Sequence, residues 1–290
     1  MYRIITKNQL SQTVFHFIVE APRIAKKAVA GQFVIVRVAE HGERIPLTIA
    51  NHDPERGTID LYVQVVGKST DELCRVDVAV GLADVVGPLG MPTHIEKVGH
   101  VVCVGGGVGV APMLPIARAF RAAGNRITGI IGAREERLLI MENEMRSVCD
   151  ELVICTNDGS KGRKGLVIDP LREWLEQKTE IGLVFAIGPM VMMRAVCDLT
   201  RPYNVKTMVS LNTVMLDGTG MCGACRVNID GQVKFTCVDG PDFDGHHVDF
   251  DELMNRQQRF ARFEKESWQE YKRQHNEENC QCLTPKQPAS

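Results

Sequence analysis

The sequence predicts an antiparallel β barrel, an α/β domain of alternating strands and helices, a small cysteine-rich loop subdomain and a C-terminal helix. Short β-rich runs separated by Gly, Asp and Pro turns occupy residues 2–97. From His100 onward, strand and helix patterns alternate, which is typical of a parallel sheet with helices on both faces. Residues 209–248 interrupt this alternation with glycines and cysteines. We therefore expect four regions, at residues 1–98, 99–208, 209–248 and 249–290.

The composition excludes several classes of protein. At 290 residues, the chain is long enough for two domains that each bury a core. A net charge of −2 does not favour a nucleic acid or an anionic membrane as partner. Residues 1–20 lack the pattern of a secretory signal, so we expect a cytoplasmic protein whose ten cysteines are reduced thiols or cofactor ligands. Residues 101–117 are uncharged, but their glycines and prolines favour a buried strand and a helix start over a membrane span.

The individual elements follow from local patterns of apolar residues. In the first region, strands are expected at residues 15–21, 32–39, 45–52, 57–66 and 76–87. In the second region, strands are expected at residues 100–104, 126–133, 151–157, 182–188 and 205–212. The helices between them are expected at residues 112–124, 135–149, 167–178 and 189–200. A charged helix is expected at residues 250–279, with an irregular apolar stripe that either packs on its own domain or binds a partner.

Four residues in the third region are candidate metal ligands. Asp217, Cys222, Cys225 and Cys237 follow the spacing D-x4-C-x2-C-x11-C, which is the pattern of plant-type two-iron ferredoxins with an aspartate in place of the first cysteine. The glycines at 218, 220 and 223 suit a loop whose backbone N–H groups approach the sulfides of a cluster. The spacing therefore favours an iron-sulfur cluster.

Other interpretations of these cysteines remain open. A C-x2-C pair also occurs in structural zinc sites, in thioredoxin-like redox motifs and, more simply, among packed core thiols. Cysteines 74, 103, 149, 155 and 197 lie in strand or helix patterns and are expected in the core. Cys280 and Cys282 lie near the C-terminal end and are not assigned to a site.

A glycine-rich loop in the second region is a candidate anion site. It follows a strand pattern and opens a helix, as in Rossmann-like domains, so its backbone N–H groups can bind a pyrophosphate. Two further loops follow strands of the same domain, where open α/β sheets bind ligands, although each also reads as an ordinary turn. The candidate residues are Gly105, Gly106, Gly107, Val108, Gly109, Ala111, Pro112, Asp158, Gly188, Pro189 and Met190.

The barrel region contributes two more candidate anion-binding turns. One comprises Arg44, Pro46, Leu47 and Thr48, in which the arginine suits a diphosphate. The other comprises Gly67, Ser69 and Thr70, which provide hydroxyl and N–H donors before a short helix. Taken singly, both are also explained as ordinary turns with a solvated arginine and a capped helix.

Taken in order, RIPLT, GGGVGVAP and DGTGMCGAC make residues 1–250 resemble the ferredoxin-NADP reductase superfamily. Within it, the chain is similar to the FAD- and [2Fe-2S]-containing small subunits of NADH-dependent reduced ferredoxin:NADP oxidoreductase, also called sulfide dehydrogenase. A related family, the electron-transfer subunits of dihydroorotate dehydrogenase, uses four cysteines as cluster ligands, whereas the former uses an aspartate and three cysteines. Asp217 therefore favours the former.

The resemblance implies the cofactors and the reaction. It implies that the barrel turns bind FAD, that the loops of the second region bind a nicotinamide nucleotide, and that hydride passes between nicotinamide and flavin. The flavin then exchanges single electrons with the cluster, and no side chain acts as general acid or base. We expect NAD(H), although Arg134 also suits the 2′-phosphate of NADP(H) unless it pairs with an acid such as Glu135.

The resemblance also implies a complex. Its partner would be a larger flavin and iron-sulfur subunit, similar to the small subunit of glutamate synthase, on which electron bifurcation with ferredoxin occurs. Two alternatives remain: the electron-transfer subunit of dihydroorotate dehydrogenase, and a non-catalytic nucleotide-binding module with structural zinc.

Overall fold

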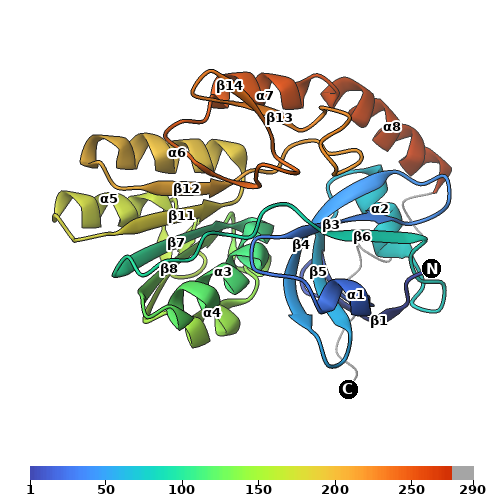
Figure 1. Ribbon diagram of the computed structural model, residues 1–290, viewed down its shortest axis with the longest axis horizontal. Helices are drawn as coiled ribbons and strands as arrows, with labels where there is room; N and C mark the ends of the chain where they lie inside the picture. The colour runs from blue at the N-terminus through green and yellow to red at the C-terminus, as the bar shows by residue number, and fades with distance from the viewer. Residues whose placement is uncertain (276–290) are drawn as a thin grey trace.

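The computed structural model describes residues 1–275, which contain two large sheets and a smaller C-terminal region. In Figure 1, the antiparallel sheet lies at the right in blue and cyan, and the parallel sheet lies at the left in green and yellow. Helices α7 and α8 run along the top, across both. This arrangement confirms the predicted fold class. No helix within residues 1–275 is both long and apolar enough to cross a membrane.

The N-terminal sheet has six antiparallel strands in the order β1-β2-β5-β4-β3-β6. An isolated bridge between Tyr2 and Leu82 brings the start of the chain against the segment that precedes β6, so the sheet curls into the predicted barrel. Its core is formed by alternate residues such as Phe15, Phe17 and Val19. The elements are β1 (Ile4–Gln9), β2 (Val14–Glu20), α1 (Pro22–Ala25), β3 (Phe33–Arg37), β4 (Arg44–Asp53), β5 (Thr58–Gln64), α2 (Lys68–Arg75) and β6 (Asp84–Leu89).

Two details of this sheet differ from the expectation. Strand β1 was not among the predicted runs, because its residues IITKNQ are mostly polar after the first two. The predicted strand at residues 76–87 becomes β6 only at Asp84. Before it, Asp77 accepts hydrogen bonds from the N–H of Ala79 (2.8 Å) and of Val80 (3.0 Å), which form a turn in place of a strand.

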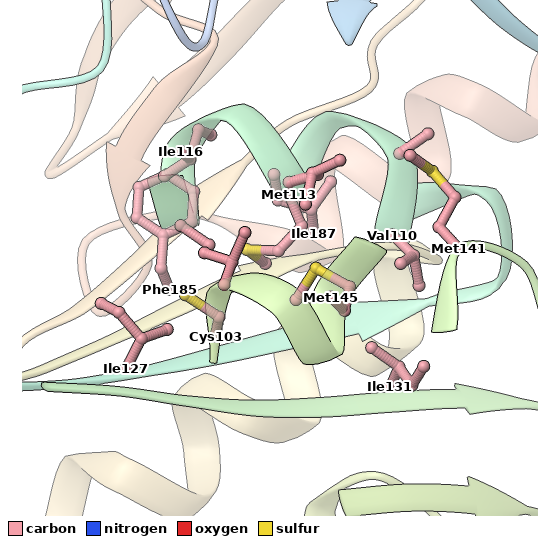
Figure 2. Close-up of a cluster of buried hydrophobic side chains, with 14 of the residues drawn as sticks. Cys103, Val110, Met113, Ile116, Ile127, Ile131, Met141, Met145, Phe185 and Ile187 are labelled. Atoms are coloured by element: carbon pink, nitrogen blue, oxygen red, sulfur yellow. The ribbon is translucent and has the colours of Figure 1, made fainter. Parts of the chain in front are cut away.

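The second sheet has the order β10-β9-β8-β7-β11-β12-β15, in which all but β15 are parallel. Successive residues of β7 face opposite layers: Val101 and Cys103 pack against α3 and α4, while Val102 and Val104 pack against α5 and α6. Figure 2 shows the first of these layers, in which Met113 and Met145 lie over the strands. The strands are β7 (His100–Gly106), β8 (Arg126–Ala133), β9 (Glu151–Thr156), β10 (Arg163–Lys164), β11 (Leu183–Ile187), β12 (Thr207–Ser210) and β15 (Asp242–Asp244).

The helices of this domain are α3 (Val110–Ala122), α4 (Glu142–Val148), α5 (Ile168–Glu176) and α6 (Met190–Thr200). The helix predicted at residues 135–149 is divided into a 3-10 turn, Glu136–Leu138, and α4. Met141 adopts a left-handed conformation (φ 58°) between them and is buried, as is Ile140. This break allows the adjacent side chains of Ile140 and Met141 both to be buried. In one continuous helix, two adjacent side chains would point in different directions.

The C-terminal region connects all parts of the molecule. Hairpin β13 (Arg226–Ile229) and β14 (Gln232–Phe235) precedes β15, which pairs with β12, so the predicted third region completes the parallel sheet. The single helix predicted at residues 250–279 is two helices, α7 (Phe250–Gln258) and α8 (Ala261–Gln274). Tyr271 of α8 is buried against α2, where the Arg75 guanidinium lies 5.9 Å from its ring centroid. Cys280 and Cys282 lie outside the described residues.

Candidate functional site

A cavity of about 1100 Å³ lies where the two sheets meet. Phe33 and Tyr62 line it from the antiparallel sheet, and the loops after β7, β8, β9, β11 and β12 line it from the parallel sheet. This volume exceeds what one small ligand requires and suits two bound nucleotides. The parallel strands reverse their order between β7 and β11, which is where open α/β sheets bind ligands.

The glycine-rich loop after β7 borders this cavity. Gly106, Gly107, Val108, Gly109, Ala111 and Pro112 line it, whereas Gly105 is buried in β7. Gly107 has φ +56° and open space where a Cβ would lie, so its backbone can face a ligand closely. A Cβ on Gly109 would lie only 2.5 Å from the carbonyl oxygen of Ile187. Glycine is therefore required at position 109 because the backbone packs against the end of β11. The sequence motif alone predicted ligand binding for Gly109 and did not show this packing role.

The other predicted loops of this domain differ in how they meet the cavity. Gly188 and Pro189 line it, but Met190 is buried as the first residue of α6. Asp158 is absent from the lining, and its neighbour Asn157 takes that place. The Asp158 carboxylate accepts hydrogen bonds from the N–H (3.0 Å) and the hydroxyl (2.7 Å) of Ser160, which hold its pKa below the ordinary value. Asp158 is therefore charged and tied into its own loop.

The predicted residues of the antiparallel sheet lie in two groups. Pro46, Leu47 and Thr48 of β4 line the cavity. Arg44, at the start of β4, is exposed and lies outside the lining, as do Gly67, Ser69 and Thr70 at the start of α2. The Thr70 hydroxyl accepts hydrogen bonds from the N–H groups of Val66 (3.0 Å) and Gly67 (3.1 Å), so it caps the helix.

One contact at the start of α2 indicates an anion site. The Ser69 hydroxyl donates a hydrogen bond to the carboxylate of Glu43, which places a negative group at the N-terminus of the helix. Arg44 adjoins Glu43 in the chain and is exposed. The Glu43 carboxylate thus occupies a position at the helix N-terminus where a diphosphate would find the Ser69 hydroxyl. These residues fit the diphosphate of FAD.

The loop that contains Asp217 is organised around its side chain. Its carboxylate accepts hydrogen bonds from the N–H groups of Thr219 (2.7 Å) and Cys222 (3.1 Å), which lower its pKa from the ordinary value. Gly218, Gly220 and Gly223 all have positive φ, between +65° and +83°. Asp217 and Cys222 therefore belong to one tight glycine turn, with the carboxylate charged.

Cys225 and Cys237 form a buried pair beside this turn, with their sulfur atoms 3.2 Å apart. Burial and the neighbouring Cys225 raise the pKa of Cys237 to about 12. Cys222 is exposed, and no group of three acidic, cysteine or histidine side chains converges on one point within residues 1–275. Asp217, Cys222 and Cys225 nevertheless lie on one loop in which three glycines have positive φ, and hairpin β13–β14 brings Cys237 beside Cys225. This set of three thiols and a carboxylate suits an iron-sulfur cluster.

The cysteine pair packs directly against the antiparallel sheet. Phe33, Ile35 and Met215 form one buried cluster with Cys225 and Cys237. Two of these residues, Phe33 and Met215, also line the large cavity. The cavity and the cysteine pair therefore adjoin the same buried cluster.

Helix α7 holds the other side of the cysteine loop. The Arg256 guanidinium donates a hydrogen bond to the carbonyl of Ala224 (3.2 Å), between Cys222 and Cys225. Burial and the nearby Arg226 and Arg259 lower the pKa of Arg256 from its ordinary value. The loop thus lies beside several positive charges, which favour thiolate ligands.

Several lining residues were not predicted from the sequence. They include Gln12 and Thr13 of the turn between β1 and β2, Tyr62 and Gln64 of β5, Ser210 at the end of β12, and Leu211, Asn212, Met215 and Pro241 beyond it. Strand β12 ends at Ser210 and is followed by Leu211 and Asn212, and the rule that ligands bind at the carboxyl ends of parallel strands applies to it as well. Tyr62 and Gln64 of β5 carried no comparable signal, because they lie within a regular strand pattern.

Two protein-family models match the chain. One is described as the iron-sulfur cluster binding domain of dihydroorotate dehydrogenase B and matches residues 212–249. The other is an oxidoreductase NAD-binding domain and matches residues 103–198. The first matched region contains the cysteine loop with its hairpin, and the second lies within the parallel-sheet domain.

Similar proteins cover almost the whole chain. An electron transfer subunit homolog of dihydroorotate dehydrogenase B (NAD(+)) from Thermotoga maritima is 46% identical over 268 residues, 92% of this chain and 94% of its own. The corresponding electron transfer subunit of Desulforamulus reducens is 30% identical over 254 residues, 85% of this chain and 96% of its own. A chain in the solved structure of NADH-dependent reduced ferredoxin-NADP oxidoreductase, a flavin-based electron-bifurcating protein, is 45% identical with a TM-score of 0.88. That match covers 93% of this chain and 98% of the other.

Proposed function

The chain belongs to the FAD-, NAD- and iron-sulfur-binding electron-transfer subunits of the ferredoxin-NADP reductase superfamily, and from this we propose its specific reaction. It passes electrons between NAD(H) and a [2Fe-2S] cluster by way of FAD. The observation that carries this proposal is the shared buried cluster, because Phe33 and Met215 line the cavity and belong to the cluster that contains the cysteine pair. A flavin in the cavity and a cluster on the cysteines would be close neighbours.

The antiparallel sheet holds FAD in this proposal. Pro46, Leu47 and Thr48 lie along the cavity for the ring, and Arg44 with Ser69 binds the diphosphate at the start of α2. Glu43 leaves the Ser69 hydroxyl when the diphosphate binds. FAD, when bound, accepts a hydride from a reduced nicotinamide and releases electrons one at a time.

The parallel sheet orients the nicotinamide nucleotide. The N–H groups at the start of α3 and the open backbone at Gly107 bind its diphosphate, and Gly188 and Pro189 border the nicotinamide half. The chain places the two ligands against each other and excludes water from the space between them. No side chain is required to add or remove a proton for hydride transfer.

Asp217, Cys222, Cys225 and Cys237 hold the cluster. Buried apolar residues around Cys225 and Cys237 limit access of water, and Arg256 holds the loop backbone between the first two cysteines. We also propose that the regions at residues 1–98, 99–208 and 209–248 bind FAD, nucleotide and cluster respectively.

A larger subunit completes the proposed enzyme. The similar chain in the NADH-dependent reduced ferredoxin-NADP oxidoreductase supports a bifurcating complex, whose partner would resemble the small subunit of glutamate synthase and exchange electrons with ferredoxin. The second candidate is the electron-transfer subunit of dihydroorotate dehydrogenase, which the names of the curated relatives and the match at residues 212–249 favour. Asp217, in place of a cysteine, favours the first.

Anaerobic titration of the purified chain with NADH tests the proposal. We expect flavin absorbance to bleach and the EPR signal of a reduced [2Fe-2S] cluster to appear. Cys225→Ser, the matched variant, should lose the cluster signal yet still bleach with NADH. A colourless protein that contains zinc would support the nucleotide-binding module instead. Purification of the native complex separates the other two candidates, since an orotate-forming partner would contradict the bifurcating assignment.

A further inference from the structure

A buried carboxyl group lies between the large cavity and the linker that joins the two sheets. Asp242 of β15 pairs with Ser210 of β12, and Ser210 lines the cavity. The Oδ2 atom of Asp242 accepts a hydrogen bond of 2.5 Å from the hydroxyl of Thr93, in the linker between β6 and β7. Its Oδ1 atom is shielded from solvent and has no hydrogen-bond partner among the described residues. Asp242 therefore has one oxygen atom that is free to bind a proton.

The segment before Asp242 packs against the part of the antiparallel sheet that is proposed to hold the flavin ring. A Cβ on Gly90 would lie 3.1 Å from the Gly240 carbonyl oxygen and 2.9 Å from the ring of Phe33. Phe33 lines the cavity and pairs with Thr48 across β3 and β4. In the parallel sheet, β15 lies on the far side from β8 and β9. Asp242 is thus on the flavin side of the cavity.

No opposite charge balances Asp242 within the described part of the chain. The neighbouring strand β12, with the sequence TMVS, has no charged residue. On the same strand as Asp242, Asp244 accepts a hydrogen bond from the N–H of His246 (3.0 Å) and lies 3.9 Å from Nε2 of His247. The charged residues that flank the linker and β12 pair among themselves; they are His94, Glu96 and Lys206. Burial therefore raises the pKa of Asp242 to about 6, against hydrogen bonds from two hydroxyl groups.

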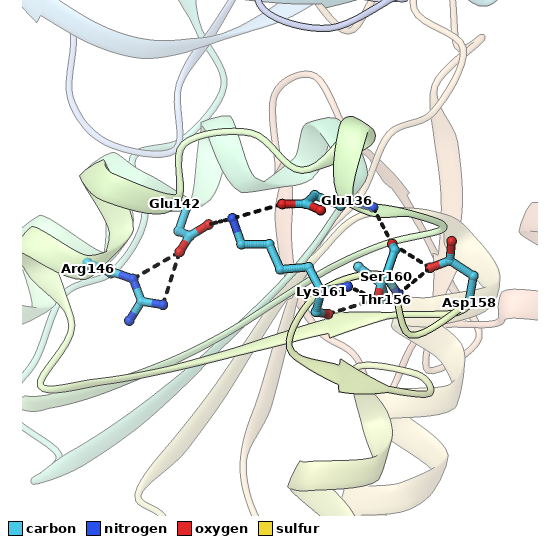
Figure 3. Close-up of polar contacts among 7 residues, drawn as sticks. All are labelled: Glu136, Glu142, Arg146, Thr156, Asp158, Ser160 and Lys161. Carbon is cyan, nitrogen blue, oxygen red and sulfur yellow. Dashed lines mark hydrogen bonds and ion pairs between the residues drawn. The ribbon is translucent and has the colours of Figure 1, made fainter.

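Acidic groups at the opposite end of the cavity are held in the charged form. Figure 3 shows Lys161 between the carboxylates of Glu142 (2.7 Å) and Glu136 (3.6 Å). Asp158 accepts two hydrogen bonds from a serine of its own loop. The hydrogen bond from Lys161 lowers the pKa of Glu142, and the loop hydrogen bonds lower the pKa of Asp158. These groups stay ionised near neutral pH, whereas Asp242 can gain or lose a proton there.

We infer that Asp242 takes up a proton when the flavin site gains electrons and releases it when the electrons leave for the cluster. This inference rests on the proposed function. A hydride from NADH brings two electrons and one proton, so it adds one negative charge to the cavity. A new negative charge disfavours an existing one nearby, so the Asp242 carboxylate binds a proton that reaches it from cavity water through the Ser210 hydroxyl. When both electrons have passed to the cluster, one proton leaves the flavin and one leaves Asp242, and the charge of the site returns to its starting value.

Replacement of Asp242 with asparagine tests this inference, because it keeps the shape of the side chain and removes the titration. Potentiometric titration of the flavin- and cluster-loaded protein, followed by flavin absorbance, gives the flavin potential at each pH. The slope of potential against pH gives the number of protons bound with two electrons. Above about pH 6, this number should rise from about one toward two in the wild type and stay near one in Asp242→Asn. Asp77→Asn, at an exposed aspartate of the antiparallel domain, is the control and should behave as the wild type.

Thr93→Val provides a second test that leaves the carboxyl group in place. It removes a hydrogen bond to the charged form of Asp242, so the pKa of Asp242 should rise. The extra proton uptake should therefore move to higher pH. Infrared difference spectra between oxidised and reduced protein should show the carbonyl band of a protonated carboxyl group in the wild type, and Asp242→Asn should lose this band.

The outcomes are distinct. An extra proton in the wild type that disappears in Asp242→Asn and moves to higher pH in Thr93→Val supports the inference. Equal proton numbers in the wild type and Asp242→Asn at every pH, or an unchanged pH range in Thr93→Val, overturn the role of Asp242 and leave the proposed function standing. Failure of the wild type to hold flavin or to bleach with NADH overturns both.

Discussion

The sulfur atoms of Cys225 and Cys237 lie 3.2 Å apart because hairpin β13–β14 brings its two ends together. Arg226 pairs with Phe235 across the hairpin, and Thr236 donates from its N–H (3.1 Å) and its hydroxyl (2.9 Å) to the carbonyl of Cys225. The register of the hairpin, rather than the spacing of the C-x2-C motif, thus determines which two thiols meet.

Removal of iron should convert this pair into a disulfide. In air, two electrons and two protons pass from the facing thiols to oxygen, whereas exposed Cys222 has no partner at comparable distance among the described residues. Chelator-treated protein should therefore show a Cys225–Cys237 linkage in non-reducing peptide mass spectrometry. Cys222→Ser is the control and should form the same linkage. A predominant linkage of Cys222 to Cys225 or Cys237 would contradict the geometry.

Asp217 has two separable roles, as a cluster ligand and as the side chain that organises its turn. Asp217→Asn retains an acceptor oxygen for Thr219 but loses the charge, and Asp217→Cys supplies a thiolate. If Asp217 is a ligand, the asparagine variant should hold the cluster weakly and the cysteine variant should keep it with a shifted potential and shifted EPR g-values. Redox titration monitored by EPR measures both. Spectra and potentials identical to wild type in both variants would mean that Asp217 only supports the turn.

Alanine at Gly107 and at Gly109 should have different consequences, although the two residues share one motif. At Gly107 the added Cβ meets open space, and the left-handed backbone costs about 1–2 kcal/mol. We expect a folded protein with normal flavin content and a raised KM for NADH. At Gly109 the Cβ would meet the Ile187 carbonyl at 2.5 Å, so we expect a clear loss of thermal stability. Flavin fluorescence, steady-state kinetics and melting temperature distinguish the two, and equal melting temperatures would contradict this distinction.

The order of strands and helices was largely predictable, because parallel strands buried on both faces are continuous apolar runs such as HVVCV. The break at Met141 could not be predicted, because the mixed charged and apolar residues at 135–149 fit one long helix as well as two short ones. Local sequence patterns also could not predict that β15 pairs with β12, because this pairing joins segments about thirty residues apart in the chain.

The candidate site likewise contains residues that the sequence could predict and residues that it could not. Motifs located the loops at Gly107, Gly188 and Cys225, whose backbone conformation or donor chemistry restricts the residue type. They did not show that Thr70 caps a helix or that Glu135 pairs with Arg137, because both depend on the direction of side chains. Residues that line the cavity from regular strands, such as Tyr62, carry no turn or ligand signature in the sequence.

The buried carboxyl of Asp242 gives stability a dependence on pH. Burial raises the pKa of Asp242 to about 6, although hydrogen bonds from Thr93 and Ser210 oppose the shift. Its Oδ2 accepts a hydrogen bond from the Thr93 hydroxyl (2.5 Å), but its Oδ1 is shielded from solvent and has no partner among the described residues. The folded protein therefore holds this proton more tightly than the unfolded chain, where aspartate titrates near 3.8.

The free energy of unfolding should consequently fall as pH rises from about 4 to about 6, and the loss from this group is complete above that range. The difference between the two pKa values corresponds to about 3 kcal/mol. Asp242→Asn removes the titration, so its stability relative to wild type should increase between pH 5 and pH 8, as measured by urea unfolding of the cofactor-loaded protein. Asp77→Asn is the control, because Asp77 is exposed and asparagine can still accept from the N–H of Ala79. A constant difference between Asp242→Asn and wild type across this range would show that Asp242 is already ionised at pH 5 in the folded protein.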